Sequence, residues 1–567
     1  MEPKEPLSLS RYLCLQASYA IFGVLLLYAS GLPFLVLAIA QQTDHLPGLD
    51  DGRTFYKFMF PLGVPDDISE TTSSTNLIGI DYLSIAIPAF VLSVVWEHVI
   101  IFGILPPAHR PLHVARVADS MTSVGLGVLQ ILFAQVLFLQ WFEPLYDAVY
   151  DNIRITDAFS DEKNPRNWWL CLFFADFLYY WFHRLSHEIS WMWTTHVVHH
   201  SSEEYNLTTA LRQPALDFLA PSFIVSNMLG ALIFPFDLFT AHTTFNLLYQ
   251  FWIHTQLVPP LPLVETIFNT PSLHKIHHAR NIRALGKNYG AIFSMWDRMF
   301  GTFEPEIREE DLEPLFYGVV PQLKSYNMWY ANTHHFYHML FVQTNWHGIA
   351  TPFKHWTPKD TQGCPKLGSK MNPLKKFDPQ PPSSAWKAYA VTQFMINLLS
   401  VGAYLQDAAL AGEIQSYAGL EEMDKFWFDS MLAFGISAMV LWAFCNVSSI
   451  MTLGVKGTTS TRGSILRGEG LRHGVFAGLP LVAGVVKAGT ATGQGLMYFA
   501  AAYAALAVIM LWFVRNEPER GGGGGGDEAG KDLVVALMAE ERGEERGKER
   551  EELEVAKWTW YGASKYR

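Results

Sequence analysis

Stretches of about 20 predominantly apolar residues recur along this chain, and they constrain its fold more than any other feature. A helix of that length can cross the hydrocarbon core of a bilayer, because it satisfies all of its backbone polar groups internally. Charged residues make up only 17% of the chain, against about 25% in soluble domains. We therefore predict an all-α polytopic membrane protein, a transmembrane helix bundle whose spans lie at 16–41, 82–105, 121–143, 168–186, 216–240, 386–407, 427–453, 474–492 and 494–515, with a shorter and more polar segment at 240–258.

The arrangement of positive charge predicts an orientation for this bundle. The first apolar run has no clear cleavage site of small residues, so we expect a retained span rather than a signal peptide. Lys and Arg favour the N-terminus and the loops 106–118 and 454–472, whereas 42–80 is rich in Asp and 408–424 contains neither Lys nor Arg. Because cytosolic loops carry the excess of positive charge, both termini and the histidine motifs described below are predicted to face the cytosol.

Cysteine usage and net charge exclude several other classes of protein. The four cysteines are far apart and form no C-x-x-C motif, which argues against both a disulfide framework and a zinc knuckle. The net charge of −12 provides no basic surface for a nucleic acid, so no nucleic-acid partner is expected.

Composition also predicts how the chain is organised into domains. The catalytic unit is expected where polar, histidine-containing motifs interrupt the apolar segments, and a run of glycines marks a flexible linker near the end. The predicted parts are N-terminal transmembrane helices at 1–150, a catalytic unit at 165–305, a cytosolic cap and linker at 306–385, a C-terminal transmembrane module at 386–515, and a Gly-rich linker with a charged tail at 516–567.

Histidines are concentrated in three short motifs within the predicted catalytic unit. These motifs are H-x-x-x-H at 183–187, H-x-x-H-H at 196–200 and H-x-x-H-H at 274–278. Residues three and four apart share one face of a helix, so each motif can direct two or three imidazoles the same way. The predicted metal ligands are His183, His187, His196, His199, His200, His254, His274, His277 and His278.

So many imidazoles predict a site with two metal ions on the cytosolic side of the bundle. A single zinc ion is typically four-coordinate and needs far fewer ligands. Imidazole also suits iron, and iron sites with open positions bind and activate O₂. We therefore expect two iron ions. The other histidines are interpreted as ordinary core or surface residues, including a group at 334–338 that lies outside the main cluster.

Carboxylates near the motifs are candidates for supporting roles. Asp176 lies in an otherwise apolar span, seven residues before His183 on the same helix face. An ionisable group in that position is expensive and usually functional, so we predict that Asp176 is an outer partner that hydrogen-bonds a ligand histidine. Glu188, Glu203 and Glu204 are adjacent to the motifs and are candidates to bridge or tune the metals.

The phrases around the motifs resemble one family in particular. The three motifs are typical of the fatty acid hydroxylase superfamily of membrane di-iron oxygenases. Four phrases around the motifs are more specific, because they resemble those of the alkylglycerol monooxygenase family. They are HVVHHSSEEYNLTTALRQ, FNLLYQFWIHTQ, NTPSLHKIHHARN and NYGAIFSMWDRMFGTFE. The similarity is dense from about 165 to 305, whereas the C-terminal helices correspond only loosely and the tail beyond 516 departs from the family pattern.

That resemblance implies a chemistry and a location. It implies an enzyme of the endoplasmic reticulum membrane that uses O₂ and tetrahydrobiopterin to hydroxylate the ether-linked carbon of an alkylglycerol or lyso-ether lipid. The products would be a fatty aldehyde and a glycerol derivative, and a pterin-recycling enzyme would be a partner. The family's essential residues carry over onto the eight histidines of the three motifs and onto Glu188, which we expect to be catalytic.

Three alternatives stay open from the sequence. One is a sterol or fatty-acyl hydroxylase or desaturase of the same superfamily that receives electrons from cytochrome b5. A zinc-dependent membrane hydrolase would need fewer histidines and no O₂. A transporter or sensor would fit the 386–515 module alone, but it would leave the three histidine motifs unexplained.

Overall fold

The computed structural model describes residues 9–30, 82–306 with short gaps, 315–339 with gaps, 377, 379, 384–406 and several positions within 441–451. Helices form almost all of the regular structure in these ranges, where β pairing is limited to two isolated bridges, Phe268 with Phe293 and Ala279 with Tyr317. The all-α prediction is confirmed for this part of the chain. The predicted spans at 474–492 and 494–515, the C-terminal tail and much of the 306–385 segment lie outside the described residues.

The chain folds as two compact units. The first comprises Met1–Arg116, Leu137–Gln322 and His335–Lys359, and the second comprises Val117–Val136, Leu323–His334 and Asp360–Arg567. All three histidine motifs belong to the first unit. In the second unit, the described helices are α6 (Val117–Leu137), most of α15 (Met328–Tyr337) and α16 (Ser384–Gln406).

Two apolar helices open the first unit. α1 (Leu9–Ala29) packs along α5 (Tyr82–His98), which continues as a π-helical segment at Val99–Ile104. Both helices also contact α12 (Phe236–Trp252), where the rings of Phe90 and Phe251 stack with centroids 4.2 Å apart. Their outward faces are apolar as well, with Val24, Leu27, Val91, Val95 and Phe102 exposed. A helix that is hydrophobic all round is typical of a membrane span.

Length and hydropathy support one span among the described helices. The helical stretch Ala86–Ile104, of 19 residues, is long and apolar enough to cross a bilayer. The apolar stretches Leu13–Leu27 and Val117–Phe133 are shorter than that criterion requires.

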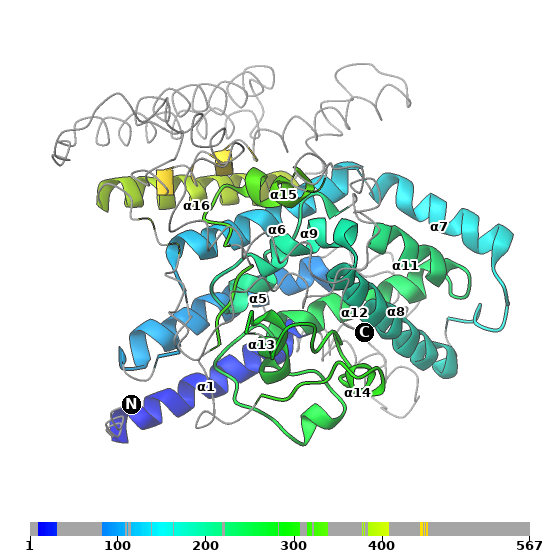
Figure 1. The fold of residues 1–567 in the computed structure, drawn as a ribbon, viewed down its shortest axis with the longest axis horizontal. Helices are drawn as coiled ribbons and strands as arrows, with labels where there is room; N and C mark the ends of the chain where they lie inside the picture. The colour runs from blue at the N-terminus through cyan, green and yellow to red at the C-terminus, as the bar shows by residue number, and fades with distance from the viewer. Residues whose placement is uncertain are drawn as a thin grey trace, which may run out of the picture. The chain divides into compact units, whose positions relative to one another are not determined.

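The first histidine motif lies on α8 (Pro165–Glu188), which packs against α9 (Ser190–His200), α11 (Pro221–Ala231) and α12 (Figure 1). Asn164 caps the start of α8 by accepting a hydrogen bond from the main-chain N–H of Arg166, and Pro165 occupies the first helical position, where its missing N–H costs nothing. α7 (Leu139–Ile153) lies against α11. Aromatic residues of these helices form the core, among them Tyr146, Trp168, Tyr180, Phe239 and Tyr249.

The span predicted at 216–240 is wrong, because the chain turns within it. α11 ends at Ala231 after 11 residues, which is about 16 Å of helix at 1.5 Å per residue and too short for a core of about 30 Å. Pro235, with extended backbone, then precedes the first residue of α12. α12 begins directly after this break, and His254 lies two residues after its last residue, Trp252.

Short elements complete the surroundings of the histidine motifs. They are α10 (Leu207–Ala210), the 3-10 turn Val264–Thr266, α13 (Pro271–His278) and α14 (Met295–Met299).

Candidate metal centre

Each histidine motif lies at the C-terminal end of a helix. The first closes α8, the second closes α9 and the third closes α13. Ile189 adopts an extended conformation between α8 and α9, so the second helix starts immediately with a new direction. A helix C-terminus carries partial negative charge. Three such ends directed at one place favour a bound cation.

The structure brings all nine predicted ligand histidines together and sorts them into two groups. We call them the five-histidine group and the four-histidine group. The first contains His183, His187, His196, His200 and His277, and the second contains His199, His254, His274 and His278. Within each group, the candidate ligand nitrogens all lie within 4.8 Å of one another.

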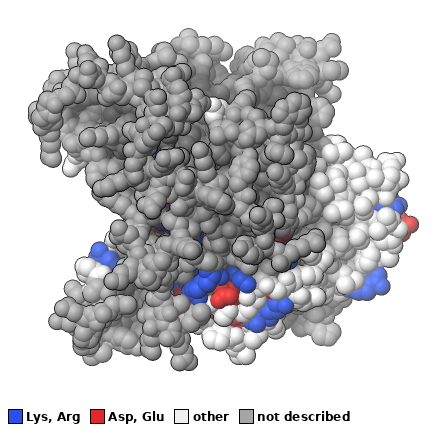
Figure 2. Space-filling view, viewed as in Figure 1, with Lys and Arg blue, Asp and Glu red and all other residues white. Residues whose placement is uncertain are grey.

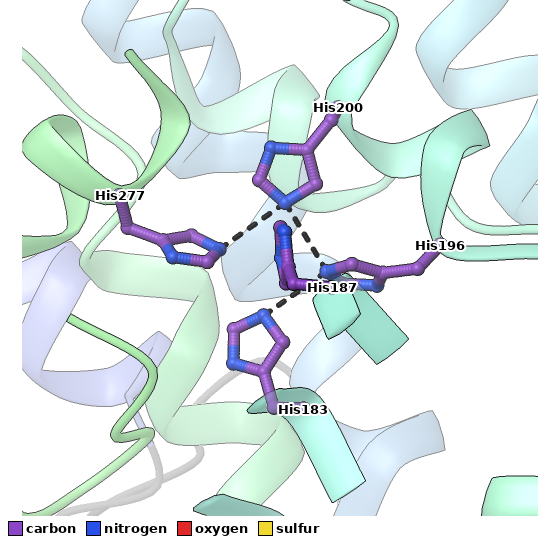
Figure 3. Close-up of side chains that lie close together, drawn as sticks. All are labelled: His183, His187, His196, His200 and His277. Carbon is purple, nitrogen blue, oxygen red and sulfur yellow. Dashed lines mark hydrogen bonds between the residues drawn. The ribbon is translucent and has the colours of Figure 1, made fainter. Parts of the chain in front are cut away.

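The rings of the five-histidine group point toward a common centre (Figure 3). The Nε2 atom of His196 lies 3.0 Å from that of His183 and 3.1 Å from that of His200. The Nε2 atom of His277 lies 3.1 Å from that of His200. The Nε2 atom of His187 is buried and has no hydrogen-bond partner. The group therefore contains one orphaned nitrogen among several that crowd one another.

His254 is central to the four-histidine group. Its Nε2 atom lies 3.1 Å from that of His274, 3.2 Å from that of His278 and 3.3 Å from that of His199. The two groups adjoin, because the rings of His200 and His278 stack with centroids 4.4 Å apart. Two metal positions beside one another would fit this arrangement.

The second ring nitrogens show why a metal fits between these rings. Nδ1 of His199 lies 3.1 Å from the carbonyl oxygen of Arg212, and Nδ1 of His254 lies 2.7 Å from that of Gln250. A carbonyl only accepts, so each Nδ1 carries the proton and each neutral Nε2 presents a lone pair. Two lone pairs 3.3 Å apart, with no proton between them, repel each other unless a cation lies between them.

The spacing between nitrogens also agrees with coordination. Imidazole nitrogens bind a metal such as zinc at about 2.0–2.1 Å, so two ligands at a right angle lie about 3.0 Å apart. Pairs separated by 3.0–3.3 Å therefore have the spacing of nitrogens that share one ion.

Burial keeps these imidazoles neutral. The pKa of His199 is lowered from 6.5 to about 4, mainly by burial; the hydrogen bond to the Arg212 carbonyl opposes this effect, and the positive charge of Arg212 adds to it. Burial likewise lowers the pKa of His277 and of His278 well below the ordinary value. A metal ligand must be deprotonated, so the histidines are in the state that binds a metal at neutral pH.

Asp176 lies elsewhere than expected. Its carboxylate is fully buried and makes four hydrogen bonds, none of them to a histidine. The donors are the side chains of Asn246 and Trp296 and the main-chain N–H groups of Ile292 and Phe293. Four of the ligand histidines, His183, His199, His254 and His277, hydrogen-bond to main-chain carbonyls instead. Asp176 acts on the loop beside the site.

The glutamates next to the motifs lie outside both histidine groups. Glu188 pairs with Arg184 one turn earlier, with an Nε–Oε1 distance of 2.9 Å. Glu203 and Glu204 both pair with Arg116, which precedes α6. None of the three carboxylates bridges the histidine groups in this structure.

The isolated histidines that the structure describes also stay outside the groups. His242 is buried with its ring against Trp168, at a centroid distance of 4.4 Å. His334 and His335 belong to neither group. His338 lies outside the described residues. The structure thus places His254 in a histidine group and His242 outside both groups.

Sequence reasoning missed the residues that orient the rings. The carbonyls of Tyr289, Lys287, Arg212 and Gln250 accept hydrogen bonds from His183, His277, His199 and His254, respectively. Every residue has a carbonyl, so no side-chain pattern could have identified these four.

Comparison with known proteins identifies the same region of the chain. The model of the fatty acid hydroxylase family matches residues 168–302, which include all nine histidines. No solved structure matches the chain significantly.

Several characterised relatives are similar over much larger parts of the chain. An alkylglycerol monooxygenase of Danio rerio is 34% identical over 372 residues, which is 63% of this chain and 78% of the relative. The enzyme of Homo sapiens is 35% identical over 61% of this chain and 76% of its own length. An ornithine lipid hydroxylase of Rhizobium tropici is 34% identical over only 24% of this chain and 40% of its own. The long matches and the histidine groups within them lead to one conclusion: the chain belongs to the alkylglycerol monooxygenase family.

Proposed function

We propose that this protein hydroxylates the ether-linked carbon of alkylglycerols or lyso-ether lipids. One atom of O₂ enters the C–H bond next to the ether oxygen, and the other leaves as water with two electrons from a reductant. The resulting hemiacetal breaks its C–O bond, which releases a fatty aldehyde and a glycerol derivative. The observation that carries the proposal is the pair of adjoining groups of neutral histidine nitrogens in a chain related to alkylglycerol monooxygenases along most of their length.

The metal that best fits the two groups is iron. A histidine cluster in the fatty acid hydroxylase family indicates this metal, and we propose two ions, one held by each group. Iron with open coordination positions supplies the capacity to bind and activate O₂. The nine histidines would hold the ions through Nε2. Those whose Nδ1 donates to a carbonyl are fixed in the required orientation.

We propose that Glu188 is catalytic and that tetrahydrobiopterin is the reductant. Glu188 lies at the C-terminal end of α8, one residue after His187, and a carboxylate there can take or return a proton beside the metals. Its pair with Arg184 holds the carboxylate in place. The support for tetrahydrobiopterin, and for a pterin-recycling enzyme as a partner, is the family resemblance.

We further propose a multi-pass protein of the endoplasmic reticulum membrane with the site on its cytosolic side. In the view of Figure 2, the described surface over α7, α8 and α11 is largely uncharged. Exposed apolar side chains of these three helices include Leu145, Trp169, Leu170, Phe173 and Leu229. Such a surface suits contact with lipid, from which an alkyl chain would enter laterally. The proposed parts are transmembrane helices at 1–150 and 386–515, a catalytic unit at 165–305, a cap and linker at 306–385 and a tail at 516–567.

The test is aldehyde release from a labelled alkylglycerol by membranes that contain the protein, with and without tetrahydrobiopterin. We expect aldehyde only when the pterin is present, and iron in the purified protein. Iron without aldehyde would move the assignment to a sterol or fatty-acyl substrate with cytochrome b5 as the electron donor. Zinc in place of iron, with turnover independent of O₂, would reject the oxygenase.

A further inference from the structure

The segment from Lys287 to Glu304 contains none of the nine histidines, yet it adjoins the five-histidine group. Its first residues present two main-chain carbonyls to two histidines. The carbonyl oxygen of Lys287 lies 2.9 Å from Nδ1 of His277, and that of Tyr289 lies 2.8 Å from Nδ1 of His183. The two histidines come from different helices, α13 and α8. We call residues 287–290 the carbonyl clamp.

Asn288 holds the centre of the carbonyl clamp in an unusual conformation. Its φ of 55° is left-handed, which few residues other than glycine adopt, although asparagine tolerates it better than most. The side chain is buried, and its Nδ2 donates to the carbonyls of Leu273 at 2.9 Å and Glu304 at 2.7 Å. Its Oδ1 accepts from the N–H of Glu304 at 2.9 Å. Three hydrogen bonds thus offset the strain and keep the turn in place.

Asp297 holds the other end of the carbonyl clamp. One carboxylate oxygen accepts from the N–H of Tyr289 at 2.7 Å, and the other accepts from the N–H of Gly290 at 2.8 Å. Gly290 leaves room for this contact, since an added Cβ would lie 2.4 Å from the carbonyl oxygen of Phe293 and 2.9 Å from Oδ2 of Asp297. The N–H of Gly290 belongs to the same peptide unit as the carbonyl of Tyr289, so the carboxylate binds the unit that orients His183.

We propose that Asn288 and Asp297 are positioning residues that act through the carbonyl clamp on the five-histidine group. By receiving the Nδ1 protons of His183 and His277, the clamp keeps both Nε2 lone pairs directed at one metal. Loss of such an outer partner typically lowers metal affinity by about 10–100-fold. The inference rests on the proposed function, because it requires that this group binds iron.

Two matched substitutions separate positioning from simple stabilisation. D297N and D176N each replace a buried carboxylate that accepts from two main-chain N–H groups of the same loop. Asp176 accepts hydrogen bonds from the main-chain N–H groups of Ile292 and Phe293. Among the described residues, the carbonyls of these two do not accept a hydrogen bond from a ligand histidine. Both variants should lose thermal stability to a similar extent. Only D297N should weaken iron binding.

The measurement is iron per chain in the purified full-length protein, followed by titration with an iron chelator. We expect one of the two ions in D297N to be released at a chelator concentration about 10–100-fold lower than in the wild type, while D176N releases both like the wild type. N288G, which permits the left-handed backbone but removes the side-chain hydrogen bonds, should behave like D297N even if D297N does not accumulate.

Each outcome has a distinct meaning. Wild-type protein without iron would reject the proposed metal site itself. Wild-type protein with two ions, and equal release from D297N, N288G and the wild type, would overturn only the positioning role. Equal weakening in D297N and D176N would show that the loop matters for stability alone, which would also overturn it.

Discussion

Replacing His254 with alanine should remove one metal from this protein while leaving the fold in place. His254 follows α12, carries no histidine neighbour at helical spacing, and is brought to the site only by the tertiary structure. Its Nε2 atom lies 3.1, 3.2 and 3.3 Å from the other three nitrogens of the four-histidine group. Its Nε2 atom is therefore close to the ligand nitrogen of every other histidine in the four-histidine group.

The expected size of the effect follows from this central position. Loss of an outer hydrogen-bond partner costs about 10–100-fold in metal affinity, and loss of a ligand should cost at least the upper end of that range. A factor of about 100 corresponds to about 2.8 kcal/mol of binding free energy. The four-histidine group would keep three nitrogens, so its ion should be lost during purification.

His242→Ala is the matched control. Both histidines are 1% exposed, and His242 belongs to α12 while His254 follows its end. His242 packs on Trp168 and contacts no ligand nitrogen. Both variants should lose about 1–3 kcal/mol of folding stability through lost packing. Only H254A should fall from about two to about one iron per chain and lose aldehyde release, as measured by elemental analysis and turnover on the same preparation.

His254 would not be a metal ligand if H254A kept wild-type iron content and turnover. The same conclusion would follow if H242A lost as much iron as H254A, since the loss would then come from packing rather than ligation.

Three further predictions follow from the same contacts. E188Q should keep its iron, because Glu188 lies outside both histidine groups, but should lose about 10²–10⁴-fold in turnover as an acid–base group; loss of iron instead would make it a ligand. G290A should destabilise the protein by about 1–3 kcal/mol, because the added Cβ would lie 2.4 Å from the carbonyl oxygen of Phe293. The measurement is the Tm, which should fall; an unchanged Tm would show that the loop adapts. The metal-free protein should lose stability as the pH falls below 6.5 toward 4, because the unfolded chain protonates His199 at a higher pH than the folded chain does. Denaturant titrations that show constant stability across this pH range would contradict the lowered pKa.

The histidine motifs could be placed from sequence alone because their geometry is local. A spacing of three or four residues puts side chains on one face of any helix, whatever surrounds it. The helices α8, α9 and α13, the clustering of the motif histidines and the family could all be predicted in this way. The apolar composition likewise determined the helical class.

The tertiary structure alone decided how these histidines are divided and oriented. It joined His254 to the four-histidine group, placed Asp176 on the adjoining loop, and broke the apolar run at 231–235. It also assigned the carbonyls that receive the ring protons. Some of these contacts join residues more than 100 positions apart, as between His183 and Tyr289, and several involve backbone groups that every residue carries. No periodicity or residue type in the sequence encodes them, because they exist only once the helices have packed.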